Sequence, residues 1–532
     1  MVSGIGNGRR AIAPVTLAFL LCVALFDGRA PAWGDAPADA GVRAPVLVAP
    51  PSSAGPAFSM AAADALPAAG YVEQEFFIEG EASAYTAPQP LAADGRWAVT
   101  PGLRAPYRTR LLVRRPADAT RFSGTVIVEW LNVTAGSDGA PDWTFAHREI
   151  LRGGHAWVGV SAQWVGVASR ADVRIPTARG SLQVIDPVRY GSLVHPGDAF
   201  SYDIFSQAGR VLRAPGMLDP LPGLRVVALI AAGESQSASR MVTYINAVHP
   251  LVQVFDGFLV HSRSAGAAPL SQALAAREGS PASALATPDI SVPQGVAMPI
   301  REDTPVPVFV VQAETDVPNA LGARQPDGPR LRTWELTGTA HADAYLVSGG
   351  TNADLLTDAT CDAARTPVLD VVAINAGPHT YGLRAAVHHL AAWVRHGTLP
   401  PIGPRIEMDG STMLRDPATG IARGGVRLPE IDVPRLSLRG DRERDGNSLC
   451  FLFGRSDPWN GDADPWDGTP GDPSPTPEPS LQALYPTQEA FLSRFEAATS
   501  AAIAAGFLLE ADRAEVLTRA REAVRSVVDM PR

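Results

Sequence analysis

The sequence predicts an α/β protein whose sheet is mostly parallel and is covered by helices on both faces. Eight strand-like segments run along the chain, and helical patterns separate the later ones. Strands that alternate with helices build parallel sheets, because each helix carries the chain back across one face of the sheet. The chain has 532 residues, of which 46% are hydrophobic and 19% charged, as in globular proteins with a large core.

The eight expected strands are of two kinds. The first two segments alternate polar and apolar residues, which is typical of half-exposed antiparallel strands. The later segments are almost entirely apolar, which is typical of buried parallel strands. The expected strands cover residues 71–80, 107–116, 124–133, 156–163, 225–233, 254–262, 307–314 and 332–340.

Four helical patterns complete the predicted core. Three of them, at 141–153, 199–213 and 236–248, lie between the third and the sixth strands, and a fourth, at 381–397, follows the eighth strand. An antiparallel opening, a parallel core and a closing helix form the arrangement of the α/β-hydrolase fold. We therefore expect a catalytic domain over residues 71–400.

The N-terminal residues predict export. Residues 1–32 have the pattern of a signal peptide, because Arg9 and Arg10 precede a short apolar segment and a small-residue site ends at Ala32. This pattern predicts a periplasmic or extracellular protein that is cleaved near Ala32 and has no stable membrane insertion afterwards, with a retained anchor as the alternative. Residues 33–70 are rich in Ala, Pro and Ser and predict a loose lead-in.

Two long irregular segments interrupt or extend the predicted domain. Residues 264–303 separate the sixth and seventh strands, and we interpret them as a cap insertion. Residues 401–532 begin as an arm rich in Pro, Gly and Asp and end in a helix from about Thr487 to Val528. Long segments of this kind are either functional or disordered. We expect the arm and its helix to pack on the catalytic domain, with a disordered linker to the helix as the alternative.

Charge and cysteine content narrow the range of partners. The formal net charge is −10 and no basic tract is present, so no nucleic-acid partner is expected. Cys361 and Cys450 remain after removal of a signal peptide, and an oxidising compartment would allow a disulfide between them, with two free thiols as the alternative. Neither cysteine has a Cys or His neighbour at zinc-site spacing, so no metal site is expected.

The stretch GESQS lies where the fifth apolar strand ends and a helical pattern begins. In such a strand-to-helix turn a nucleophile can stand exposed, provided that small residues two positions before and after it relieve steric strain. Gly233 and Ser237 meet this need around Ser235, which is therefore the candidate nucleophile. A frame shifted by two residues makes Ser237 the nucleophile instead, and a plain helix N-cap is the non-catalytic alternative.

A serine nucleophile needs a base, and the base needs an acid that orients it, in the chain order Ser, then Asp or Glu, then His. The seventh strand ends in Glu314 and Asp316, and His341 follows the eighth strand. We favour Asp316 as the acid, because the acid usually lies a few residues past the strand end, and keep Glu314 as the alternative. His341 is the favoured base. His379, which follows the sequence NAGP rather than a strand, is its rival.

The oxyanion of an ester-cleaving intermediate needs backbone N–H donors. Gln236 follows the candidate serine at the start of a helix and is expected to supply one donor. The loop after the third strand contains Leu131, Asn132 and Val133, any of which could supply the second. We choose Asn132, with a simple turn-capping role as the alternative.

Five stretches together resemble a bacterial family known as the α/β hydrolase domain family, whose members are mostly predicted exported hydrolases. They are VEWLNVTAG, YGSLVHPGDAFSYDIFSQA, GESQSASRMVTYINAVHP, FVVQAETDV and WELTGTAHADAY, and the resemblance runs from about Tyr71 to Tyr485. It implies a serine-esterase layout in which Ser235, Asp316 and His341 form the triad. The chain departs from the commoner hydrolase pattern at Ser237, where a glycine is usual.

These features predict a secreted or periplasmic serine hydrolase that cleaves a small or polymeric carboxylic ester through an acyl-enzyme. Such chemistry uses only protein groups and water, so no cofactor is expected. Two alternatives stay open, an acyltransferase that uses the same triad and a non-catalytic ligand-binding protein on the same fold. The sequence leaves the identity of the substrate and the oligomeric state open.

Overall fold

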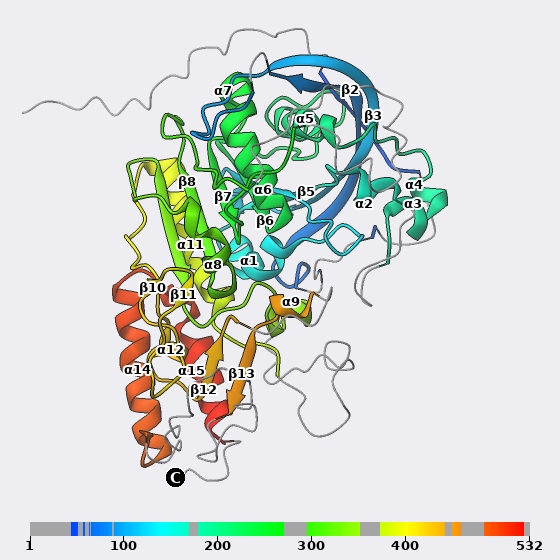
Figure 1. Ribbon diagram of the computed structural model, residues 1–532. Helices are drawn as coiled ribbons and strands as arrows, with labels where there is room; N and C mark the ends of the chain where they lie inside the picture. The colour runs from blue at the N-terminus through cyan, green and yellow to red at the C-terminus, as the bar shows by residue number, and fades with distance from the viewer. Residues whose placement is uncertain are drawn as a thin grey trace, which may run out of the picture. The chain divides into compact units, whose positions relative to one another are not determined.

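The computed structural model describes residues 44–51, 57–58, 63, 65–87, 90–169, 179–270, 295–351, 373–441, 449–458 and 484–525 (Figure 1). All of them belong to one compact unit that spans residues 42–532. The expected signal peptide lies outside the described residues, and so do residues 271–294 of the expected cap and Cys361 of the expected disulfide. What we predicted for these parts stays a prediction.

One nine-stranded sheet forms the centre of the unit, with strand order β1-β2-β3-β5-β4-β6-β7-β8-β9. Pairing is antiparallel from β1 to β2, β2 to β3 and β3 to β5, and parallel among the strands from β5 to β9. The strands are β1 (Val46–Val48), β2 (Tyr71–Thr86), β3 (Thr100–Pro116), β4 (Thr125–Trp130), β5 (Ala156–Val160), β6 (Ala228–Glu234), β7 (Gly257–His261), β8 (Val308–Ala313) and β9 (Leu331–Leu336).

All eight expected strands are present, as β2 to β9, but the sheet has one strand more than we predicted. The additional strand β1 pairs with β2 through Val46 opposite Glu79 and Val48 opposite Phe77. The expectation of a loose lead-in over residues 33–70 is therefore wrong for residues 46–48. Three residues are too few to show a periodic pattern, and this strand forms because the long edge of β2 offers free backbone groups to it.

Helices cover both faces of the sheet. Successive residues of the central strands point to opposite sides, and the apolar side chains on each side pack against helices. On β4, Val126 and Val128 belong to one hydrophobic cluster, whereas Ile127 belongs to another. The first cluster includes residues of α5 (Ser201–Arg213) and α6 (Gln236–Thr243), and the second includes residues of α1 (Pro141–Arg152) and α11 (His379–His396). A strand buried on both faces must be apolar throughout, which explains the continuous apolar runs of the sequence.

Short helical turns connect these elements. They are η1 (Ala119–Arg121), α2 (Trp164–Ala168), α3 (Leu182–Ile185), α4 (Pro187–Tyr190), η2 (Asp198–Phe200), η3 (Tyr244–Val248, a π-helical turn), α7 (His249–Val252), η6 (Glu314–Asp316), α8 (Val317–Ala320), η7 (Leu321–Ala323), α9 (Ala344–Val347), α12 (Pro429–Asp432), η8 (Cys450–Leu452) and η9 (Glu510–Asp512). Two small antiparallel pairs, β10 (Met408–Asp409) with β11 (Thr412–Met413) and β12 (Leu436–Arg439) with β13 (Arg455–Pro458), lie in the arm.

The C-terminal segment forms two helices, where we predicted one from about Thr487 to Val528. Thr487 caps the first helix, α14 (Gln488–Ala504), by accepting a hydrogen bond from the Ala490 N–H at 3.1 Å. The chain then turns at Gly506, whose φ of 81° is a left-handed conformation that ends a helix. The second helix, α15 (Arg513–Arg525), packs beside the first (Figure 1).

The described part of the arm contacts the far edge of the sheet. Val426 lies parallel to the end of β9, where its N–H donates to the Glu335 carbonyl at 2.7 Å and its carbonyl accepts from the Thr337 N–H at 3.0 Å. Trp334 of β9 is fully buried and donates its Nε1–H to the Pro401 carbonyl at 2.9 Å. The arm thereby bonds the carboxyl end of β9 and packs against Trp334 in that strand.

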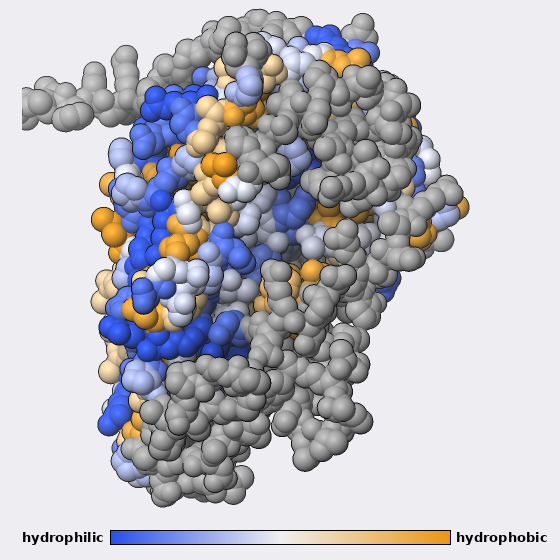
Figure 2. Space-filling view, in the orientation of Figure 1, coloured by the Kyte–Doolittle hydropathy of each residue, from blue (hydrophilic) through white to orange (hydrophobic). Residues whose placement is uncertain are grey.

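The described residues contain no helix that is both long and apolar enough to cross a membrane. On the face drawn in Figure 2, the apolar residues of the described surface lie in small groups among polar ones.

Trp334→Ala should destabilise the whole unit. The ring of Trp334 lies 5.0 Å from that of Phe309 in the sheet and 5.1 Å from that of Phe507 in the C-terminal segment. Removal of such a ring leaves a cavity that costs about 3–5 kcal/mol of unfolding free energy. Urea unfolding would measure this loss, and Leu399→Ala, at a side chain that is 52% exposed, is the control. Equal losses in the two variants would contradict the packing described here.

Candidate active site

Ser235 lies at the sharp turn between β6 and α6. Its φ of 59° and ψ of −116° place a non-glycine residue in a sparsely populated conformation, which costs about 1–3 kcal/mol. The Ser235 N–H donates to the His261 carbonyl at 2.9 Å, so the neighbouring strand β7 holds the turn in place. A strained turn of this kind exposes a serine hydroxyl at the carboxyl edge of a sheet.

Two small residues make room for the turn. A Cβ atom added to Gly233 would lie 2.9 Å from the Ser237 carbonyl oxygen and 3.0 Å from Met241 Cγ. Ser237 itself is fully buried, and its hydroxyl has no hydrogen-bond partner among the described residues. The structure therefore places Ser237, our alternative nucleophile, as a small packing residue beneath the turn.

Three side chains from three strand ends meet in one line of hydrogen bonds. His341 lies in the loop after β9, and its Nε2 is 2.8 Å from Ser235 Oγ. Its Nδ1 is 2.7 Å from Oδ1 of Asp316, which ends the η6 turn after β8. Both His341 and Asp316 are 7% exposed. The structure thus brings together the serine, acid and histidine that we favoured from the sequence.

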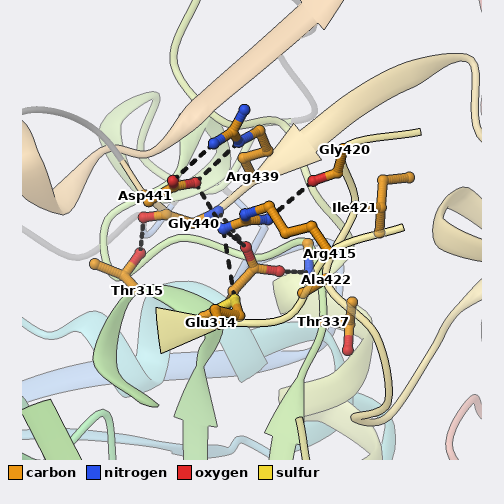
Figure 3. Close-up of polar contacts among 12 residues, drawn as sticks. Glu314, Thr315, Thr337, Arg415, Gly420, Ile421, Ala422, Arg439, Gly440 and Asp441 are labelled. Atoms are coloured by element: carbon orange, nitrogen blue, oxygen red, sulfur yellow. Dashed lines mark hydrogen bonds and ion pairs between the residues drawn. The ribbon is translucent and has the colours of Figure 1, made fainter. Parts of the chain in front are cut away.

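The side chain of Glu314, our alternative acid, is bonded to groups other than His341. Its side chain is fully buried and accepts hydrogen bonds from the Gly338 N–H at 2.6 Å and the Gly440 N–H at 2.9 Å. An ion pair with Arg415 at 3.0 Å completes its contacts (Figure 3). Glu314 therefore joins the η6 turn to the C-terminal arm.

A second carboxylate contacts the histidine, and sequence reasoning assigned it no role. Oε1 of Glu234 is 3.0 Å from His341 Nε2, the same nitrogen that faces Ser235. Oε2 of Glu234 accepts a hydrogen bond from Nδ2 of Asn132 at 2.9 Å. Glu234 directly precedes the candidate serine in the sequence, and this position is the signal that could have indicated a role in the site.

These carboxylates set the charge of His341. Burial disfavours the charged imidazolium, but Asp316 and Glu234 outweigh burial and raise the pKa of His341 well above its usual 6.5. His261, the buried histidine at the end of β7, has a pKa lowered to about 4 by burial and is therefore neutral. The base form of His341 consequently becomes populated only as the pH rises.

His379, our alternative base, belongs to a separate buried chain of hydrogen bonds. Its Nε2 is 2.8 Å from Nε2 of His261, and its Nδ1 is 2.9 Å from the Ala340 carbonyl oxygen. Nδ1 of His261 is 2.8 Å from Oδ1 of Asp142, at the start of α1. Both ring nitrogens of His379 are thus engaged away from Ser235.

The Ala340 carbonyl at the end of this chain determines which ring nitrogens carry protons. A carbonyl only accepts, so Nδ1 of His379 carries a proton, and a neutral His379 must then accept at Nε2 from His261. Neutral His261 in turn accepts at Nδ1, which requires a protonated Asp142. Burial, followed by the charge of Glu234, raises the pKa of Asp142 well above its usual value, in agreement with this assignment. The chain ends on Ala340, one residue before His341.

The two expected oxyanion donors, Gln236 and Asn132, differ in whether the backbone N–H is already hydrogen-bonded. No hydrogen bond engages the Gln236 N–H within the described part of the chain. The Asn132 N–H, in contrast, donates to the Gly139 carbonyl at 2.9 Å, so Asn132 is not a free donor and our choice of it was wrong. This backbone pairing with Gly139 closes the loop onto itself, and the loop sequence did not reveal it. Leu131 donates to Val160, and Val133 keeps an unengaged N–H among the described residues.

No group of three or more His, Cys, Asp or Glu side chains suited to a metal occurs among the described residues. The site instead consists of a hydroxyl, an imidazole and two carboxylates at the carboxyl edge of a mostly parallel sheet. This combination of fold and side chains defines the α/β hydrolase class.

The chain belongs to the family described as alpha/beta hydrolase domain, whose sequence pattern matches residues 42–518. No curated protein sequence matches it.

Several solved structures are similar to this chain at low identity. A fungal esterase of Rhizomucor miehei has 12% identity and a TM-score of 0.29, over 61% of this chain and 84% of that chain. A glucuronoyl esterase from Solibacter usitatus has 13% identity and a TM-score of 0.26, over 50% and 76%. A putative acetyl xylan esterase from Bacteroides fragilis has 10% identity and a TM-score of 0.25, over 55% and 70%.

Glu234→Gln should lower the pKa of His341. The substitution keeps an oxygen acceptor for Asn132 but removes one of the two anions that favour the imidazolium. Titration of ¹⁵N-labelled histidines by NMR would measure the change, and His341→Gln identifies the resonance.

Glu335→Gln is the matched control for this titration. Glu335 is also a buried carboxylate, but it is bonded to Arg324 and the Ile406 N–H and not to His341. An unchanged pKa of His341 in Glu234→Gln, or the same change in both variants, would contradict a direct effect of Glu234.

Proposed function

We propose that this chain is a serine hydrolase that cleaves carboxylic esters through an acyl-enzyme intermediate. The observation that carries the proposal is the line from Ser235 Oγ through His341 Nε2 and Nδ1 to Asp316 Oδ1, with distances of 2.8 and 2.7 Å. A hydroxyl, a base and an orienting acid in this order are the parts that acyl transfer needs. Membership of the alpha/beta hydrolase domain family supports the same reaction class.

Acylation begins at the neutral form of His341. Nε2 of His341 takes the proton of the Ser235 hydroxyl while Oγ attacks the ester carbonyl carbon. Asp316 accepts the Nδ1–H bond, which keeps the lone pair of Nε2 directed at the serine and stabilises the imidazolium that forms. The imidazolium then gives its proton to the departing alcohol, and the acyl group stays on Ser235.

The negative oxygen of the tetrahedral intermediate needs two backbone donors. The N–H of Gln236, at the first turn of α6, is the first of them in this proposal. Val133 supplies the second, because the neighbouring Leu131 and Asn132 N–H groups are already bonded to Val160 and Gly139.

Glu234 gives the reaction a second source of negative charge beside the base. Its carboxylate lies 3.0 Å from Nε2 of His341 and therefore stabilises the imidazolium in both chemical steps. The same carboxylate keeps the resting histidine protonated at lower pH, so the proposal includes a rate that rises with pH through the raised pKa of His341.

Deacylation repeats these steps with water. His341 removes a proton from water as the water oxygen attacks the acyl carbon, and the tetrahedral intermediate then collapses. Ser235 leaves with the proton that His341 returns to it, and the carboxylic acid product is released.

Ser235→Ala should reduce the turnover of an activated ester by about 10⁴-fold or more, because the nucleophile is lost. Hydrolysis of a panel of p-nitrophenyl esters would measure this loss, with a thermal melt to show that the variant is folded. Ser237→Ala is the matched control, since it removes a nearby hydroxyl that is buried without a partner.

Turnover by Ser235→Ala at the wild-type rate would reject the proposed function. Loss of turnover in Ser237→Ala alone would move the nucleophile by two residues. A folded wild-type protein that cleaves none of the esters and transfers no acyl group to added alcohols would favour a ligand-binding role.

A further inference from the structure

The C-terminal arm contacts the turn that carries the candidate acid. Gly440 of the arm donates its N–H to Oε1 of Glu314 at 2.9 Å, and its carbonyl accepts the Thr315 hydroxyl at 2.6 Å (Figure 3). Glu314 and Thr315 directly precede Asp316 in the η6 turn. The arm therefore bonds both residues that lead into the candidate acid.

The arm also reaches the loop that carries the candidate base. The Thr315 hydroxyl accepts a hydrogen bond from the His341 N–H at 3.1 Å. On the other side of His341, the Ala342 N–H donates to the Leu452 carbonyl of the arm at 3.0 Å. One hydroxyl, that of Thr315, thus joins the arm, the acid turn and the backbone of His341.

A partly buried ion pair adds to these contacts between the arm and the acid turn. Arg415 of the arm contacts Glu314 at 3.0 Å and Asp441 at 2.8 Å (Figure 3). The Glu314 side chain is fully buried, and its remaining bonds come from backbone N–H groups. Removal of any of these donors would leave the buried carboxylate short of a partner, which is costly, so the donors stabilise the contact between the arm and the turn.

Close packing removes the remaining freedom of the arm. A Cβ atom added to Gly440 would lie 2.5 Å from the Thr315 backbone nitrogen and 2.7 Å from the Thr339 carbonyl oxygen. The arm backbone can approach the acid turn this closely only because residue 440 has no side chain.

We propose that the C-terminal arm is a positioning element of the active site, and that Thr315 is a positioning residue that aligns His341 with Asp316 and Ser235. The proposal rests on the proposed function. Thr315 touches no reacting atom. It acts through the backbone of His341, whose side chain must hold two hydrogen bonds at once, and a displacement of about 1 Å in such a site can cost about 10²-fold in rate.

Thr315→Val and Thr337→Val form a matched pair for the test. Each replaces a hydroxyl that donates to an arm carbonyl by a methyl group of similar size. Thr315 donates to Gly440 at 2.6 Å, and Thr337 donates to Gly424 at 2.8 Å. Only the Thr315 hydroxyl also accepts the His341 N–H. A role in general stability would affect both variants alike, whereas a positioning role affects Thr315 alone.

Ester hydrolysis by the full chain, with kcat and KM measured separately, distinguishes these roles. We expect kcat of Thr315→Val to fall about 10-fold or more with little change in KM, since substrate contacts are untouched. Thr315→Ser, which keeps the hydroxyl, should restore kcat, and Thr337→Val should retain it. If Thr315→Val does not fold, Gly440→Ala disturbs the same contact from the arm side and should lower kcat in the same way.

A kcat of Thr315→Val within 2-fold of the wild type would overturn the positioning role, and so would an equal fall in Thr337→Val. Ester hydrolysis by the wild type would leave the proposed function standing in either case. Full kcat in Gly440→Ala would overturn the positioning role as well. A wild-type protein without ester hydrolysis would overturn the proposed function first and the role of the arm with it.

Discussion

The imidazole of His341 is the group on which the rest of the site depends, because it must hold an acid on one nitrogen and a hydroxyl on the other. Asp316 contacts Nδ1 at 2.7 Å, and Ser235 contacts Nε2 at 2.8 Å. The two partners come from different strands, so their meeting requires the sheet to fix all three strand ends. The strained Ser235 turn is the clearest sign of this constraint, since a non-glycine residue keeps such a conformation only where its surroundings enforce it.

Much of the structure behind the site serves to hold that imidazole. The buried chain from Asp142 through His261 and His379 ends on the carbonyl of Ala340. The arm bonds Glu314 and Thr315, which precede the acid, and Ala342, which follows the base. These supports come from parts of the chain that lie far apart in sequence. A reaction that needs accurate alignment gains from such support, because the Ala340 carbonyl and the N–H groups of His341 and Ala342 each have a defined partner.

The fold could be read from the sequence to a large extent, and the site in part. Buried parallel strands are continuously apolar, and side chains at their carboxyl ends meet at one edge. Eight strands followed from this pattern, and Ser235, Asp316 and His341 followed as the favoured triad, with Ser237, Glu314 and His379 as alternatives. Strand β1 and the break at Gly506 escaped, because three residues and one glycine carry too little pattern. The engaged N–H of Asn132 and the contact of Glu234 with the base escaped for another reason. The first depends on how the loop closes onto itself at Gly139, and the second on the approach of two residues that lie far apart in the chain.

The central claim is that His341 and Asp316 activate the Ser235 hydroxyl. Its most direct test is to treat the purified protein with a fluorophosphonate probe and to locate the adduct by peptide mass spectrometry, since the probe bonds only to a serine that is already nucleophilic. An adduct on Ser235 that disappears in His341→Gln is the result predicted here. A folded protein that stays unlabelled, or an adduct on another serine, would contradict it.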